Sequence, residues 1–122
     1  MPLFETKMNY VQKVAVFFEA ATGLTLLIAP SMVAQLLLGS GLSGVGVPVA
    51  RVAGIALIGL SIACVPGLTW VGMTIYNALV MFYLAYLGVA GGFGGVLLWP
   101  AVAVHAGLTL LFARDLFKRH PR

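Results

Sequence analysis

Three side chains that can exchange protons or hydrogen bonds lie inside long apolar stretches of the sequence. Glu19 lies within VAVFFEAATG, Asn77 within TIYNALV and His105 within AVAVHAG. Carboxyl and imidazole groups are common general acids and bases, and Asn, Glu and His can all form hydrogen bonds between helices in a membrane. We therefore select Glu19 and His105 as the candidate catalytic or proton-carrying residues, with Asn77 as their polar neighbour.

Four apolar runs, separated by Pro and Gly, must position these side chains. The chain is 61% hydrophobic and 8% charged, whereas a soluble domain is about 25% charged. Each run is about 18–20 residues long, which is enough for a helix to cross a hydrocarbon core of about 30 Å. The sequence predicts an all-α fold, an integral membrane four-helix bundle that forms a single membrane domain over residues 1–122. The spans are expected at about 10–29, 48–65, 70–89 and 97–116.

The segment between the first two spans is apolar but longer than a simple turn. It reads PSMVAQLLLGSGLSGVGVP. Ser31 is a suitable N-cap for a short helix that runs through Leu38, and Gly39 is a suitable C-terminal residue for it. We expect this helix to lie in the membrane interface, and a re-entrant segment is the alternative.

The basic residues flank the apolar region and indicate the orientation of the chain. Four spans place both termini on one side, and the positive-inside rule places that side in the cytoplasm. The protein is then a multi-pass protein of the cell (inner) membrane, in contact with membrane lipid. No basic patch interleaved with aromatic residues is present, so a nucleic-acid partner is not expected. The flanking basic residues are Lys7, Lys13, Arg114, Lys118, Arg119 and Arg122.

The rise of a helix gives each polar residue a depth in the membrane. Measured from the cytoplasmic end of its span, Glu19 lies at about 13 Å, Asn77 at about 11 Å and His105 at about 16 Å. A charged side chain that faces lipid at this depth costs roughly 2.5–3.5 kcal/mol or more. We therefore expect Glu19 to turn inward toward Asn77 and His105, where Tyr76 and Tyr83 extend a polar, ligand-binding cluster. The alternative is that these groups only hold helices together.

Three further features have mainly structural interpretations. Arg51 lies near the outer end of the second span, where its side chain can reach outward to the interface or inward toward Glu19. Small residues four apart, at Ala50 and Gly54 and at Ala103 and Gly107, predict close helix contacts that complete the bundle or a dimer. The single cysteine, Cys64, cannot form an intramolecular disulfide, and no metal-ligand spacing is present.

Most of the chain resembles small four-helix bacterial membrane proteins of the DoxX-like kind. The similarity lies in LLIAP, in VPVARVAGIALIGLSIACVPG and in LLWPAVAVHAGLTLL. The resemblance implies a four-helix bundle. Some relatives are small subunits of quinone-linked or redox membrane complexes, which suggests a quinone or a lipid as ligand here and a larger complex or a homo-oligomer as the assembly. It assigns no catalytic residue.

Three functions follow from these observations. The first is a non-catalytic accessory subunit of a membrane redox or quinone-linked complex, or a module that binds a lipophilic ligand. The second is a proton-coupled small-molecule transporter that uses Glu19, since FFEAATGLTLL is faintly similar to the first helix of small multidrug transporters. The third is a membrane-embedded proton-transfer enzyme, an isomerase or cyclase, in which Glu19 and His105 are acid and base. We favour the first function over an enzyme.

Overall fold

A computed structural model describes residues 8–119, and the fold is all-helical across that range. Residues Lys7 and Arg122, used above to infer orientation, lie outside the described residues. The helices are α1 (Tyr10–Ile28), α2 (Pro30–Leu38), α3 (Gly46–Ala63), α4 (Thr69–Val89) and α5 (Leu98–Arg119).

Four of these helices are long and apolar enough to cross a membrane. They are α1, α3, α4 and α5, and their bounds agree with the predicted spans to within about two or three residues, as expected for fraying helix ends. Pro48 and Pro100 are each the third residue of a helix, within the first turn, where the missing N–H group removes no helical hydrogen bond. The all-α, membrane-spanning fold class is confirmed.

The short helix α2 also forms, but Ser31 has a different role from the predicted one. Ala29 is the N-cap residue and makes no side-chain cap hydrogen bond, while Pro30 occupies the first turn. The Ser31 hydroxyl instead donates to the carbonyl of Leu42 at 3.3 Å and accepts from its amide at 3.2 Å. Ser31 therefore anchors the return segment to α2. Gly39 ends the helix in a left-handed conformation with φ of 82°, as predicted.

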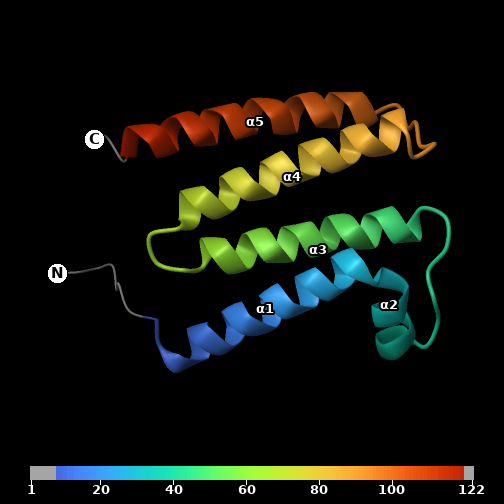
Figure 1. Ribbon diagram of the computed structural model, residues 1–122, viewed down its shortest axis with the longest axis horizontal. Coiled ribbons are helices and arrows are strands. Elements are labelled where there is room, and N and C mark those ends of the chain that lie inside the picture. Colours follow the sequence, from blue (N-terminus) through green and yellow to red (C-terminus); the bar gives the residue numbers. More distant parts are fainter. Residues whose placement is uncertain (1–7, 120–122) are drawn as a thin grey trace.

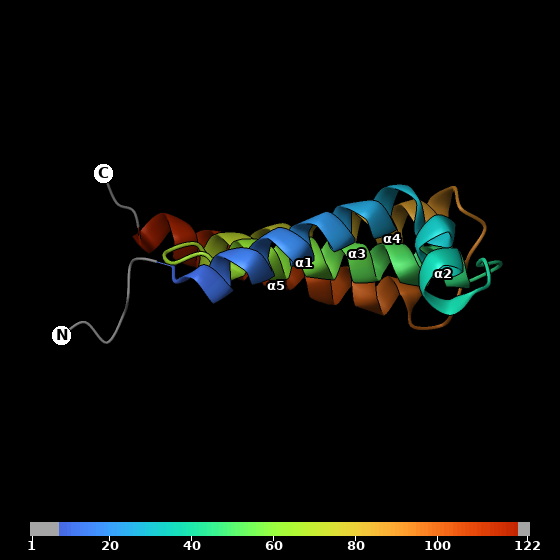
Figure 2. The same ribbon diagram turned by 90° about the horizontal axis from the view of Figure 1, so that it is seen from below.

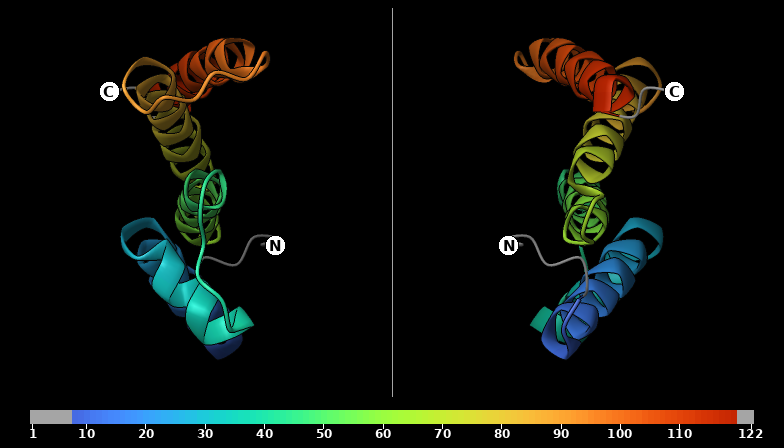
Figure 3. Two further views of the ribbon diagram at one scale, coloured as in Figure 1. Left: turned by 90° about the vertical axis from the view of Figure 1, so that its right-hand side faces the viewer. Right: turned by 90° about the vertical axis from the view of Figure 1, so that its left-hand side faces the viewer.

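The four long helices form a row in the order α1, α3, α4, α5 (Figure 1). Each contacts its neighbour in that row, α2 contacts α1 and α3, and no other pair of described helices is in contact. In a view turned by 90° about the horizontal axis the helices largely overlap, so the row is thin in this direction (Figure 2). Seen end-on it bends, so that α3 and α5 flank α4 at an angle (Figure 3). The bundle is therefore open, because α1 and α5 do not meet.

The start of α1 and the end of α5 lie at the same end of this row, together with the turn between α3 and α4 (Figure 1). We call this the terminal end. The opposite end, called the loop end, holds α2 and the segment between α4 and α5. An even number of spans produces this arrangement, and it agrees with the prediction that both termini lie on one side.

Glycines allow the backbones of neighbouring helices to touch at two crossings. A Cβ atom built on Gly54 of α3 would stand 2.6 Å from the carbonyl oxygen of Gly23 in α1. One built on Gly72 of α4 would stand 2.5 Å from the amide nitrogen of Ala63 in α3. Contacts this close hold helices together by packing, which replaces the missing hydrophobic driving force in lipid.

The two predicted small-residue pairs have different outcomes. Gly54, from the first pair, lies in the α1–α3 crossing described above. Ala103 and Gly107, from the second pair, are exposed on α5, and nothing lies within 4 Å of a Cβ built on Gly107. This face therefore does not close the bundle of a single chain, while its part in a dimer stays a prediction.

Candidate functional site

Asn77 lies near the middle of α4 and is the most deeply buried polar side chain described. Its exposed fraction is 2%. The side-chain Nδ2 donates to the carbonyl oxygen of Met73, one turn earlier, at 2.9 Å. A carbonyl oxygen can only accept a hydrogen bond, so the side-chain atom that faces Met73 must be the nitrogen, Nδ2, and the other must be the oxygen, Oδ1. The Oδ1 oxygen of Asn77 is thereby directed away from its own helix, toward α5.

His105 on α5 makes the contact that joins the two helices. Its Nδ1 lies 2.7 Å from Oδ1 of Asn77. Because an amide oxygen has no hydrogen to donate, Nδ1 must carry the hydrogen of this bond. In the uncharged imidazole the other nitrogen, Nε2, then presents a lone pair. The similar depths of Asn77 and His105 predicted this neighbourhood, and the structure brings the two residues together.

The Nε2 atom of His105 has no hydrogen-bond partner among the described residues and is not fully buried. Among the described residues, the only buried side-chain nitrogen or oxygen without a hydrogen-bond partner is Oε1 of Glu19. No hydrogen bond involves Nε2, and the imidazole as a whole is half-buried. The ring of Tyr76 meets the imidazole edge-on, with 5.8 Å between the ring centroids. His105 is thus held against α4 by Asn77 and Tyr76, and its Nε2 is left without a partner among the described residues.

Tyr76 also lines a hollow between the terminal-end halves of α3 and α4. The hollow has a volume of about 320 Å³. This volume is at the lower end of the range for small-molecule sites. Its lining is apolar apart from the tyrosine: Ala56, Gly59, Leu60, Ala63, Met73 and Tyr76.

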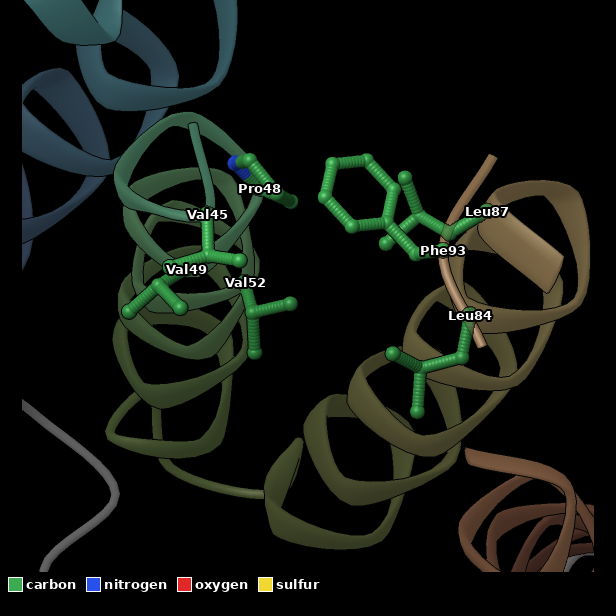
Figure 4. Close-up of a pocket in the computed structure, with 7 residues that line it drawn as sticks. All are labelled: Val45, Pro48, Val49, Val52, Leu84, Leu87 and Phe93. Carbon is green, nitrogen blue, oxygen red and sulfur yellow. The ribbon is translucent and has the colours of Figure 1, made fainter. Parts of the chain in front are cut away.

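A second apolar hollow, of about 280 Å³, lies between the same two helices near the loop end (Figure 4). Val52 of α3 and Leu84 and Leu87 of α4 border it, and Phe93 from the loop before α5 covers it. The amide of Phe93 donates to the carbonyl of Leu87 at 3.2 Å, which fixes the loop against the end of α4.

Both hollows lie between α3 and α4. Val52, Ala56, Gly59 and Ala63 recur every three or four residues and so share one face of α3. The α4 residues that line the hollows, Met73, Tyr76, Leu84 and Leu87, likewise share one face. We call this face of α3 and α4, with its two separate hollows, the trough. His105 lines neither hollow, and lies next to the trough through its ring contact with Tyr76.

The structure does not bring Glu19 to the Asn77–His105 pair. Glu19 lies on α1, and α1 contacts α2 and α3 but neither α4 nor α5. The expected three-residue cluster is therefore not formed within one chain, because α3 separates the carboxyl group from the imidazole. The Oε1 oxygen of Glu19 is buried without a hydrogen-bond partner. Glu19 precedes Gly23 by one helical turn and so shares its face toward α3.

Arg51 does not reach Glu19 and instead holds the end of α1. Its Nε donates to the carbonyl oxygen of Leu27 at 3.1 Å. Leu27 belongs to the last turn of α1, where carbonyl groups lack partners within the helix. A positive side chain at this position also complements the helix dipole. Arg51 is half-buried, and this contact agrees with the structural role that the sequence favoured, which stays a prediction.

Tyr83, also predicted for the polar cluster, lies about two turns from Tyr76 on α4 and stacks on Tyr86 with 6.3 Å between the ring centroids. No contact joins it to His105 among the described residues. Sequence reasoning missed two parts of the site, the Met73 carbonyl and Phe93. The first is a backbone atom and leaves no signal in residue type, while the glycines around Phe93 in AGGFGG did indicate a tight loop.

Within residues 8–119, no group of three or more His, Cys, Asp or Glu side chains gathers in a way that would hold a metal ion. The fold and the site together define a four-span integral membrane protein with an apolar trough between α3 and α4 and a hydrogen-bonded Asn–His pair beside it. No known protein family, curated protein or solved structure matches this chain. Its resemblance to DoxX-like proteins accordingly stays a prediction.

Proposed function

We propose that the protein is a small non-catalytic membrane module that holds a lipophilic ligand in the trough and serves as an accessory subunit of a membrane complex. The observation that carries this proposal is the oriented imidazole of His105, whose Nε2 has no partner among the described residues and whose ring contacts Tyr76, a residue that lines an apolar hollow. His105 is the eighth residue of α5 and so lies about 10 Å from the nearer helix end. Polar side chains at such depth are expensive, and they commonly mark functional sites.

The open row of helices supports the accessory role. α1 and α5 each leave most of their surface uncovered, and the two edges of the row do not meet. Partner helices from a larger complex or a second copy would have room to pack on either edge. The resemblance to DoxX-like proteins points in the same direction, toward a quinone or a lipid as the ligand.

The two alternative functions are less well supported by this geometry. Both the proton relay of a transporter and the acid–base pair of an enzyme require Glu19 and His105 to act together. α3 lies between the helices that carry them. The buried, unpartnered oxygen of Glu19 supports a separate role for that residue, without His105.

Filling the hollow should prevent ligand binding. Ala56 lines the hollow beside Tyr76, and in Ala56→Phe the added ring would occupy the space of the ligand. Ala53, one turn earlier on α3, is exposed outside both hollows, so Ala53→Phe is the matched control. We expect wild type and Ala53→Phe to retain an apolar molecule through purification in mild detergent, as measured by mass spectrometry of the extract. Ala56→Phe should retain about tenfold less.

Equal retention by both phenylalanine variants would contradict the trough as the binding site. Circular dichroism and thermal unfolding of each variant would show whether a loss in Ala56→Phe arises from unfolding. If Ala56→Phe unfolds, the smaller change Ala56→Leu is the replacement, and it should lower retention by less while the helical spectrum is kept.

We also propose that the terminal end faces the cytoplasm, on the basis of the flanking basic residues. Cys64, the only cysteine, is exposed at the terminal end of α3. A membrane-impermeant maleimide should label it in inverted membrane vesicles and not in intact cells. A Cys64→Ser, Gly94→Cys variant moves the thiol to the loop end and should show the opposite pattern. Labelling of Cys64 from outside intact cells would reverse the orientation.

A further inference from the structure

We infer that the ligand of the trough is a lipophilic alcohol or phenol whose hydroxyl group donates a hydrogen bond to Nε2 of His105. This inference rests on the proposed function and specifies the chemistry of the ligand's polar group. A molecule with only carbonyl or ether oxygens, such as an oxidised quinone, would lack the hydrogen that the site is built to accept.

The carbonyl group of Met73 has no hydrogen to donate. Nδ2 of Asn77 must therefore face it, at 2.9 Å, and Oδ1 must face His105. Asn77 cannot rotate to exchange these atoms without placing its oxygen against the Met73 oxygen. Burial to an exposed fraction of 2% leaves the amide no water to replace the lost hydrogen bond. The amide is a fixed acceptor for α5.

A fixed acceptor at 2.7 Å determines the tautomer of the imidazole. Nδ1 carries the hydrogen, and Nε2 is left as an acceptor that no described residue satisfies. In histidine generally, the hydrogen bond made by one ring nitrogen determines whether the other nitrogen carries a hydrogen. A ligand that binds Nε2 must bring its own hydrogen, and a hydroxyl group is the donor that a lipophilic molecule commonly carries.

The rest of the trough defines the shape of the ligand. Tyr76 lines the terminal-end hollow and places a ring edge against the imidazole, a position in which a flat ring or a short chain can pack. Eleven residues of α4 separate Tyr76 from Leu87, which is about 16 Å along the helix. The second hollow, under Phe93, is separate from the first and lies about this distance away, with the buried Val80 between them. The trough therefore suits one polar head near mid-membrane and an alkyl or isoprenoid tail that runs toward the loop end.

Two probes that differ in a single hydrogen-bond donor test this inference. 4-Dodecylphenol and 4-dodecylanisole share the ring and the chain, but only the phenol has a hydroxyl hydrogen. Binding to the full chain in detergent micelles would be measured by tryptophan fluorescence and equilibrium dialysis. We expect wild type to bind the phenol about tenfold more tightly than the anisole, as the loss of one hydrogen bond to a partly exposed acceptor implies. In His105→Phe the two probes should bind within about twofold of each other.

The outcomes separate this inference from the proposed function. If wild type binds both probes equally, and Ala56→Phe binds neither, the trough is a ligand site but the hydroxyl inference is wrong. If wild type binds neither probe, or Ala56→Phe binds them as wild type does, the proposed function itself fails for this class of ligand. A phenol preference that persists in His105→Phe would also overturn the inference, because another group would be the acceptor.

A spectroscopic measurement tests the tautomer without any ligand. His105 and His120 are the only histidines, so His120→Gln leaves one imidazole in the chain. The ¹⁵N chemical shifts of its two ring nitrogens distinguish a protonated nitrogen from one with a free lone pair. We expect the lone-pair shift at Nε2 in this variant and a mixture of tautomers when Asn77→Leu is added. A hydrogen on Nε2 in the variant with Asn77 intact would overturn the inference.

Discussion

Gly54→Leu should prevent folded protein from accumulating in the membrane. The Cβ atom alone would stand 2.6 Å from the carbonyl oxygen of Gly23 and 3.0 Å from the amide nitrogen of Leu27. Both are backbone atoms, so no side-chain rotation relieves the overlap, and α1 must separate from α3. Forced overpacking costs about 1–3 kcal/mol and occasionally more, and here the whole helix contact is lost with it. Expression level and detergent-resistant folding, followed by circular dichroism on titration with SDS, would measure the effect.

The matched control is Gly107→Leu on α5. Nothing lies within 4 Å of a Cβ built there, so a single chain should accept the leucine with little loss and a small gain in helix propensity. A wild-type SDS transition for Gly54→Leu would show that α1 and α3 do not pack as described. If Gly107→Leu alone were defective, its face would be in contact with another chain, as the predicted dimer would require.

Asn77→Leu should lower stability and also lower the affinity for a hydroxyl-bearing ligand. Leucine is similar in volume, so the main change is the loss of the hydrogen bond to His105. The unfolding free energy should fall by about 1–2 kcal/mol, because Nδ1 of His105 is left without its acceptor. Hydrogen bonds in membranes average nearer 0.6 kcal/mol, which sets the lower limit. Affinity falls as well, because the imidazole no longer has its lone pair fixed on Nε2.

A double-mutant cycle with His105→Phe isolates this contact. If the 2.7 Å hydrogen bond exists, the two substitutions together should cost less than the sum of their separate costs. The control cycle combines Asn77→Leu with Thr109→Val. Thr109 bonds to the carbonyl of His105 within its own helix and so should be additive with Asn77. Additivity in the first cycle would mean that Asn77 and His105 do not interact.

Hydropathy predicted the spans because a helix in lipid must be long, apolar and self-sufficient in hydrogen bonds. Depth along each span then predicted that Asn77 and His105 would meet, since α4 and α5 follow each other in the chain and pack as antiparallel neighbours. The same reasoning failed for Glu19. Depth gives the height of a residue but not the order of helices around it, and in this fold α3 takes the place next to α1.

Residue types at helix ends predicted the local backbone conformation but not contacts with distant segments. Gly39 was predictable because a left-handed helix end favours glycine. The role of Ser31 was not, since a serine at a helix start can equally well bond to a distant segment, and here the partner is Leu42, eleven residues away. The hollows beneath Phe93 and beside Tyr76 depend on the angle between α3 and α4. The residue pattern of either helix alone does not predict that angle.

Because the described helices form a row that does not close on itself, the face that carries the trough is not enclosed within a single chain. If the protein binds a ligand as proposed, molecules would reach the trough sideways, by diffusion in the plane of the bilayer. Occupancy is then governed by the mole fraction of ligand among the lipids, not by its concentration in water. A weakly held compound that partitions strongly into membranes would therefore fill the trough, while a water-soluble analogue with the same head group would leave it vacant.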